Sequence, residues 1–153
     1  MNDPLLQTIR NRAMNYLARR EHSYQELRDK LLRKGFELSL IDLVLTKLQE
    51  NRLLSDQRFT DCFIQSRINK GQGPLRIKQE LQSRGIDKNL VDSVLQNYDN
   101  HTWQPLANQV RHQHFGSQLP QDSQERAKQF RFLQYRGFTS EQIRIALTHE
   151  SET

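Results

Sequence analysis

The stretch Leu31-Leu-Arg-Lys-Gly35-Phe36 has two counterparts further along the chain, Leu81-Gln-Ser-Arg-Gly85-Ile86 and Leu133-Gln-Tyr-Arg-Gly137-Phe138. Each reads Leu, two variable residues, a basic residue, Gly and an apolar residue, and the three align without a gap. The glycines recur about every 50 residues, a spacing typical of repeat proteins. Matching apolar residues, Ile41, Val91 and Ile143, follow six positions beyond each glycine. The sequence therefore predicts three copies of one structural unit.

The pattern around each glycine predicts two helices joined by a tight turn. Gly35, Gly85 and Gly137 would take the left-handed conformation that ends a helix, and the apolar residue after each would pack back on it. We therefore interpret these three glycines as structural. The helices before them have recognisable start signals, which are Ser23 with Glu26, Pro74 after Gly73, and Asp122 with Glu125.

A third helix precedes each of these pairs, so the sequence predicts an all-α fold of nine helices. The expected helices span residues 4–20, 23–34, 38–52, 56–69, 74–84, 87–99, 103–115, 122–136 and 139–150. They group into three three-helix repeats at 1–54, 55–100 and 101–153. Apolar residues make up 35% of the chain, too few for one large core, which favours an elongated tandem array of small cores.

Basic residues gather in two parts of the chain, and the formal net charge is +5. Within residues 10–34 and 58–84, Lys and Arg clearly outnumber Asp and Glu. Single basic residues often only solvate a helix, but this clustering favours a polyanionic partner.

Several features exclude other classes of protein. Cys62 is the sole cysteine, so no intramolecular disulfide forms, and we expect it to be a small buried residue. No apolar run is long enough to span a bilayer, and the N-terminus lacks a continuous apolar segment like that of a signal peptide. We expect a cytoplasmic monomer that does not bind membranes.

No motif indicates catalysis, a cofactor or a metal ion. His112 and His114 are two residues apart, so on a helix they point to nearly opposite sides and cannot share a metal. Trp103, Phe132 and Tyr135 could stack on nucleobases near Arg131 and Arg136, but we favour hydrophobic packing for all three.

The middle of the chain contains a series of short motifs, which are Ser55-Asp-Gln-Arg-Phe59, Phe63-Ile-Gln-Ser-Arg67, Gly71-Gln-Gly-Pro74, Arg76-Ile77, Glu80-Leu81 and Arg84-Gly-Ile86. This series closely resembles the RecX family of recombination regulators. The resemblance extends to Arg20–Leu27 in the first repeat and to Trp103, Leu106–Ala107, Phe115–Gly116, Leu119–Pro120 and Arg131–Gly137 in the third. It thus covers nearly the whole chain.

The resemblance implies a non-enzymatic protein that binds the RecA recombinase filament and inhibits its ATPase, strand-exchange and coprotease activities. It further implies a role in DNA repair and regulation of the SOS response. We place the partner-binding face on basic residues of the first two repeats. They are Arg67, Lys70, Arg76, Lys78 and Arg84 in the second repeat and Arg28, Lys30, Arg33 and Lys34 in the first. Arg67 and Arg76 could instead form structural ion pairs with Glu80 or Asp61.

Two other functions stay open. A three-helix unit also resembles a DNA-binding helix-turn-helix, but the helices that would read bases, such as residues 38–52, are not enriched in basic residues. Nonspecific contact with the phosphate backbone of single- or double-stranded DNA is the remaining form of that alternative. A metal-dependent hydrolase is the third possibility, and nothing in the residue spacing supports it.

Overall fold

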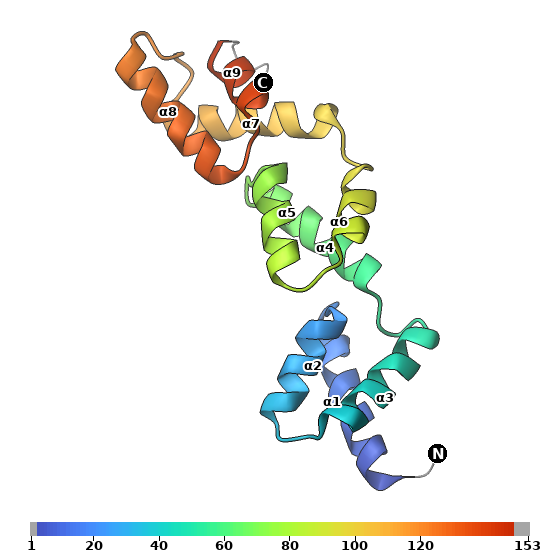
Figure 1. Cartoon of the computed structure of the whole chain (residues 1–153). Helices are drawn as coiled ribbons and strands as arrows, with labels where there is room; N and C mark the ends of the chain where they lie inside the picture. Colours follow the sequence, from blue (N-terminus) through green and yellow to red (C-terminus); the bar gives the residue numbers. More distant parts are fainter. Residues whose placement is uncertain (1–2, 149–153) are drawn as a thin grey trace. The chain divides into compact units, whose positions relative to one another are not determined.

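The computed structural model describes residues 3–148, and within this range the chain forms nine α-helices and no β-strand (Figure 1). The helices are α1 Pro4–Arg19, α2 Tyr24–Arg33, α3 Leu38–Glu50, α4 Asp56–Asn69, α5 Pro74–Ser83, α6 Lys88–Leu95, α7 Asn100–Phe115, α8 Ser123–Arg136 and α9 Ser140–Thr148. The prediction of an all-α fold is confirmed. The end of the last predicted helix, residues 149–150, lies outside the described residues.

The largest error in the predicted helix boundaries lies between α6 and α7. The sequence predicted a helix to residue 99 and another from residue 103, whereas α6 ends at Leu95 and α7 begins at Asn100. The Asp99 carboxylate accepts a hydrogen bond from the His101 amide at 2.9 Å, which caps α7 earlier than expected. Pro105 lies inside α7, where it has no N–H to donate to the carbonyl of His101 one turn earlier.

The predicted start signals are confirmed at three helices. Ser23 Oγ accepts from the Glu26 amide at 3.0 Å and the Asp122 carboxylate accepts from the Glu125 amide at 2.7 Å, while Pro74 is the first residue of α5. Each cap satisfies a backbone N–H that has no partner within its helix.

The three repeated glycines all have positive φ, with values of +91° at Gly35, +83° at Gly85 and +102° at Gly137. The amide after the turn returns to the preceding helix, since Phe36 N donates to Leu31 O at 3.4 Å and Phe138 N to Leu133 O at 3.2 Å. This is the hydrogen bond that a left-handed residue at a helix end allows.

The chain forms two compact units. Unit 1 contains the residues up to Cys62 together with Arg84–Ile86, and unit 2 contains Phe63–Ser83 and the residues from Asp87 onward. The division falls inside α4, because the start of that helix is tied to the turn before α2. Tyr24 N donates to Asp56 Oδ1 at 2.8 Å, and Arg58 Nε pairs with Glu21 Oε1 at 2.9 Å. The predicted repeat boundaries at 54/55 and 100/101, and the elongated arrangement, stay predictions.

Each unit has an apolar core formed by the helix faces that the sequence pattern indicated. In unit 1, α1, α2 and α3 pack on one another around Ile9, Ala13, Leu27, Leu31, Ile41, Val44, Leu45, Leu48 and Leu54. In unit 2, α7, α8 and α9 enclose Ala107, Val110, Leu133, Phe138, Ile143, Ala146 and Leu147, and α5 packs on α6. Burial of each such Leu or Ile side chain stabilises the fold by about 1.5–3 kcal/mol.

A buried arginine holds the loop between α7 and α8. Arg111 is only 1% exposed, and its guanidinium donates to the carbonyls of Gly116 at 3.0 Å and Gln118 at 3.3 Å and to the side chain of Gln129 at 3.4 Å. Burial lowers the pKa of Arg111 below its ordinary value. The two carbonyls after α7 accept from N–H groups that burial removes from water.

Two glycine turns meet backbone to backbone inside unit 2. The Gly73 amide donates to Arg136 O at 2.8 Å, and the Leu75 amide donates to Gly137 O at 2.9 Å. A Cβ atom on Gly73 would lie 2.5 Å from the carbonyl carbon of Gly137, and one on Gly137 would lie 2.3 Å from Arg76 Cβ. Only glycine fits at either position, so this contact fixes α5 against the end of α8.

We predict that Gly137→Ala weakens unit 2 more than Gly35→Ala weakens unit 1. Both substitutions strain a positive φ, at about 1–2 kcal/mol each. A Cβ at Gly35 meets no atom within 4 Å, whereas one at Gly137 collides with Arg76, which adds about 1–3 kcal/mol. Amide hydrogen exchange, read separately for the two units, measures the loss of opening free energy. Equal losses would contradict the proposed role of the contact.

Candidate partner-binding site

The basic residues predicted to bind a partner are distributed over both units. Unit 1 contains Arg28, Lys30, Arg33, Lys34 and Arg84, and unit 2 contains Arg67, Lys70, Arg76 and Lys78. The predicted cations thus divide into two sets, one in each unit.

In unit 2 a single carboxylate joins two of these arginines. Glu80 Oε1 lies 3.0 Å from Arg76 Nε, and Glu80 Oε2 lies 3.1 Å from Arg67 Nε. The Arg76 contact is also a hydrogen bond, while the Arg67 N–H is not aligned for one. The structural ion pair considered for Arg67 and Arg76 therefore exists, and Glu80 is its acid. Two guanidinium groups share one carboxylate, so the trio keeps a net positive charge.

Aromatic rings support both arginines. The Arg67 guanidinium lies 4.5 Å from the centre of the Phe63 ring, and that of Arg76 lies 5.1 Å from the centre of the Tyr135 ring. Such cation–π contacts hold a guanidinium in place while part of it stays accessible. The side chains of Arg67 and Arg76 are 18% and 32% exposed.

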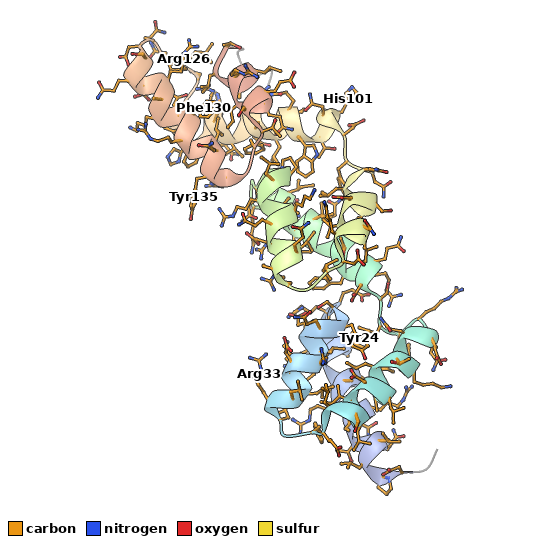
Figure 2. All side chains as sticks on the ribbon, viewed as in Figure 1. Tyr24, Arg33, His101, Arg126, Phe130 and Tyr135 are labelled. Atoms are coloured by element: carbon orange, nitrogen blue, oxygen red, sulfur yellow. The ribbon has the colours of Figure 1, made fainter. Side chains whose placement is uncertain are left out.

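The three aromatic residues weighed for base stacking differ in their environments. Trp103 is buried, and its indole N–H donates to Tyr98 O at 3.1 Å, so the packing prediction is confirmed there. Phe132 is half-buried and stacks on His114. Tyr135 is 74% exposed, so the packing prediction is wrong for this residue (Figure 2). Its position in the last turn of α8 turns it outward from the core that Leu133 enters.

The two remaining predicted cations of unit 2 differ in their partners. Lys78 Nζ pairs with Asp92 Oδ1 at 2.9 Å, which joins α5 to α6 and neutralises the charge locally. Lys70 follows the end of α4 and is exposed. Lys70 is therefore the more available cation.

In unit 1 the predicted cations likewise divide into paired and exposed groups. Arg28 Nε lies 3.7 Å from Asp42 Oδ1, and Lys30 Nζ lies 2.9 Å from His22 Nε2 and 4.9 Å from the centre of the Tyr16 ring. Arg33 and Lys34 are exposed at the end of α2. Cations at a helix C-terminus are favoured by the helix dipole, so this position stabilises them without removing them from solvent.

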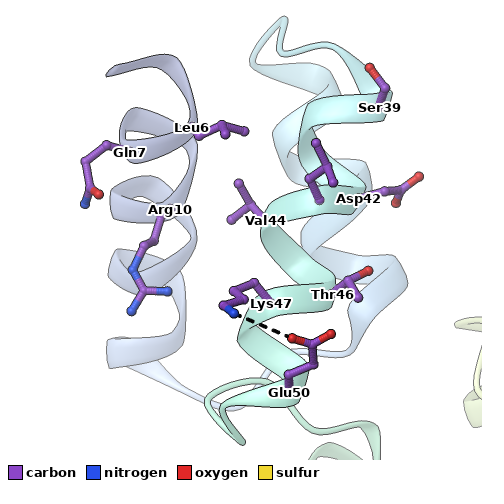
Figure 3. A pocket seen from close by; sticks show the side chains of 10 residues that line it. Leu6, Gln7, Arg10, Ser39, Asp42, Val44, Thr46, Lys47 and Glu50 are labelled. Carbon is purple, nitrogen blue, oxygen red and sulfur yellow. Dashed lines mark ion pairs between the residues drawn. The ribbon is translucent and has the colours of Figure 1, made fainter. Parts of the chain in front are cut away.

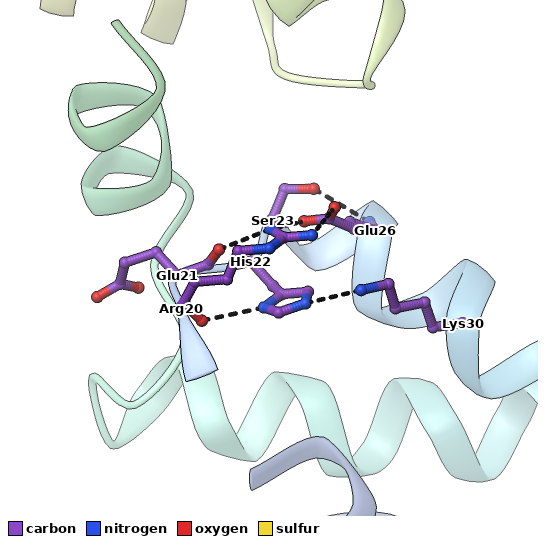
Figure 4. A network of polar contacts seen from close by, with 6 residues as sticks. All are labelled: Arg20, Glu21, His22, Ser23, Glu26 and Lys30. Carbon is purple, nitrogen blue, oxygen red and sulfur yellow. Dashed lines mark hydrogen bonds and ion pairs between the residues drawn. The ribbon is translucent and has the colours of Figure 1, made fainter. Parts of the chain in front are cut away.

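A buried histidine organises the turn that leads into α2 (Figure 4). His22 is 2% exposed, its Nδ1 lies 3.0 Å from Arg20 O, and its Nε2 faces Lys30. Because a lysine ammonium only donates, Nε2 must accept, which places the ring proton on Nδ1. Burial lowers the pKa of His22 below its ordinary value, and the charges of Arg20 and Lys30 act in the same direction.

The same turn contains a bidentate ion pair. Arg20 donates to both oxygens of Glu26, at 3.0 and 2.7 Å. Burial would raise the pKa of Glu26, but the hydrogen bonds and charge of Arg20 outweigh it and hold that pKa below its ordinary value. The pair closes the loop between α1 and α2.

Sequence reasoning did not identify a groove between α1 and α3 in unit 1 (Figure 3). It has a volume of about 670 Å³ and is lined by apolar side chains, including Leu6 and Val44, and by charges of both signs. Lys47 and Glu50, at 3.8 Å, form an ion pair on its wall. None of the predicted partner-binding residues lines it.

Other predicted features can be assessed directly. Among residues 3–148 no cluster of three or more His, Cys, Asp or Glu side chains could hold a metal ion. Cys62 is exposed on α4, so the prediction that it is buried is wrong. The inward positions of α4 are taken by Phe59, Thr60, Phe63 and Ile64. No helix in the described part of the chain has the length and apolar character needed to cross a membrane.

The all-helical fold and its exposed cations are those of a binding protein built from three-helix repeats. Family models for the first, second and third three-helix domains of RecX match residues 10–48, 55–95 and 106–147. A regulatory protein RecX of Halorhodospira halophila (strain DSM 244 / SL1) is 41% identical over 146 residues, which are 95% of this chain and 90% of that protein. The chain belongs to the RecX family of regulatory proteins, and it is not an enzyme.

Further relatives agree in sequence and in structure. A regulatory protein RecX of Pseudomonas fluorescens (strain SBW25) is 41% identical over 138 residues, covering 90% of this chain and 88% of that protein. The crystal structure of RecX from Lactobacillus salivarius matches with a TM-score of 0.81 at 21% identity, covering 93% of this chain and 94% of that one. This structural match shows that the two proteins share a fold.

We predict that acid destabilises unit 1 through His22. The unfolded chain binds a proton near pH 6.5 but the folded chain only at lower pH, so stability is lost as pH falls below 6.5 toward the lowered pKa. The contribution of Glu26 is retained over this range, because it is lost only as pH falls through a pKa below 4.5. Urea unfolding between about pH 7 and pH 5 should show this loss.

The matched control is another histidine. His22→Gln should flatten the pH dependence of unit 1, and His101→Gln, at a side chain that is 97% exposed, should not. If the stability of His22→Gln fell with pH as steeply as that of the unaltered protein, a group other than His22 would be responsible.

Proposed function

We propose that this protein binds the RecA filament and inhibits its ATPase, strand-exchange and coprotease activities, with a role in DNA repair and SOS regulation. The observation that carries the proposal is the set of cations held on rigid helices, above all Arg67 and Arg76 around Glu80 with Lys70 nearby in sequence. Family membership and the net charge of +5 support it.

The partner surface proposed here consists of the nine basic residues named from the sequence. Arg67 and Arg76 share a single carboxylate and are supported by aromatic rings, so they meet a partner with little loss of side-chain entropy. Lys70, Arg33 and Lys34 are exposed and would attract acidic side chains or phosphates of a filament. Such charges raise the association rate and make binding sensitive to salt. We propose that the protein acts as a cytoplasmic monomer.

Direct contact with DNA phosphates is a second candidate function. Helix α3, the counterpart of a recognition helix, carries Asp42 and Glu50 beside Lys47, and Glu50 pairs with that lysine. This placement opposes base reading in the major groove, whereas exposed cations at the ends of α2 and α4 suit nonspecific phosphate contact. The contact would then be independent of sequence and steeply dependent on salt.

We predict that the protein inhibits ATP hydrolysis by RecA on single-stranded DNA and that this inhibition depends on the exposed cations. Arg33→Glu, Lys34→Glu and Lys70→Glu together should raise the concentration for half-inhibition about tenfold or more. Arg67 and Arg76 are left intact, because reversing them would place several carboxylates around Glu80.

A control triple keeps the change in charge the same. Arg126→Glu, Lys128→Glu and Arg144→Glu alter exposed residues of α8 and α9 and should inhibit like the unaltered protein. Circular dichroism should show equal helicity in both triples. Equal inhibition by both would remove these cations from the proposed surface, and inhibition abolished by excess DNA would favour simple competition for DNA.

A further inference from the structure

The end of α4 forms a polar cleft with α7 and α8. Its volume is about 410 Å³, and three basic side chains, Lys70, His114 and Arg136, line it. The amide side chains of Asn69, Gln109 and Gln113 also line it, and no Asp or Glu within residues 3–148 does. Basic groups together with amide N–H donors suit the oxygens of a phosphate.

Arg136 is held in position before any ligand binds. Its Nη1 donates to Lys70 O at 3.1 Å, and its guanidinium lies 5.0 Å from the centre of the Phe132 ring. A Cβ on Gly71 would lie 3.2 Å from Arg136 Nη1, so glycine at position 71 gives the guanidinium its room. A cation fixed in this way loses little entropy on binding an anion.

His114 is positioned by the same aromatic ring. It stacks on Phe132 with the ring centres 4.0 Å apart and the planes 13° apart. Phe115 contacts both rings edge-on, at 4.7 Å from His114 and 5.2 Å from Phe132. The imidazole therefore has a fixed orientation at the wall of the cleft, where it can donate a hydrogen bond.

The residue before Arg136 offers an open aromatic face. Tyr135 is 74% exposed and projects from the end of α8 (Figure 2). The Arg76 guanidinium lies 5.1 Å from the centre of its ring. Tyr135 lines a second hollow, of about 370 Å³, together with Leu75, the amides of Gln79 and Gln134, and the ion pair of Arg76 with Glu80. Arg136 lines the cleft, and its neighbour Tyr135 lines the second hollow, so both hollows lie beside the last turn of α8.

We propose that single-stranded nucleic acid binds at this place, with a phosphate in the cleft of Lys70, His114 and Arg136 and a neighbouring base stacked on Tyr135. The proposal rests on the DNA contact proposed above and names its site and strand type. Aromatic rings bordered by arginines bind unpaired bases, whose faces are not available within a duplex. No carboxylate from the described part of the chain lines the cleft, which favours phosphate over a basic protein segment.

The test measures binding of labelled oligothymidine, and of an abasic oligonucleotide of equal length, to the full chain without RecA. Tyr135→Ala should weaken oligothymidine binding about tenfold and leave abasic binding unchanged. Tyr135→Phe keeps the ring and should bind like the unaltered protein. Lys70→Gln should weaken both ligands and reduce the salt slope by about 0.7, since one phosphate contact is lost.

Lys128→Gln, an exposed lysine in the middle of α8, is the matched control and should change neither affinity. Equal effects of Lys70→Gln and Lys128→Gln, or full affinity in Tyr135→Ala, would overturn the site while leaving the DNA contact intact. If the unaltered protein bound neither oligonucleotide, both the proposed site and the proposed DNA contact would be wrong. If Tyr135→Ala impaired only the inhibition of RecA, the ring would contact protein and the proposal would be wrong.

Discussion

Close backbone contact between Gly73 and Gly137 is the constraint on which unit 2 depends. The amides of Gly73 and Leu75 donate to carbonyls at the end of α8, and no side chain fits between the two turns. The glycine that ends α8 therefore has two roles, since it closes its own repeat and receives the start of α5. Gly35 has the first role alone, because its surroundings are open. One motif thus serves both local folding and the packing of neighbouring repeats.

This contact also determines where charge can lie. It holds α5 beside the last turn of α8, so Arg76 reaches both Glu80 on its own helix and the ring of Tyr135. Glu80 also pairs with Arg67 of α4. A surface of mobile lysines would lose more entropy on meeting a partner than arginines held between a carboxylate and an aromatic ring. Arg67 and Arg76, which belong to a basic stretch of the sequence, are therefore held in fixed positions by the fold.

Much of the fold was predictable because its signals are local. Caps such as Ser23 and Asp122 and the repeated glycines depend on only a few neighbouring residues. The candidate site was less predictable, because pairing partners such as Asp92 for Lys78 come from other helices. Cys62 and Tyr135 were wrongly expected to be buried, since apolar or aromatic character does not fix the side of a helix on which a residue lies. The two hollows beside α8 require tertiary packing that no spacing encodes.

The clamp formed by Arg111 has a consequence for how the loop after α7 can evolve. Its guanidinium holds the loop through the backbone carbonyls of Gly116 and Gln118, not through their side chains. Every residue has a backbone carbonyl, so a substitution at position 118 leaves the hydrogen bond from Arg111 in place. Gly116 is constrained by its φ of +89° alone. Substitutions should therefore accumulate in this loop faster than at Arg111, whose replacement would release the whole segment.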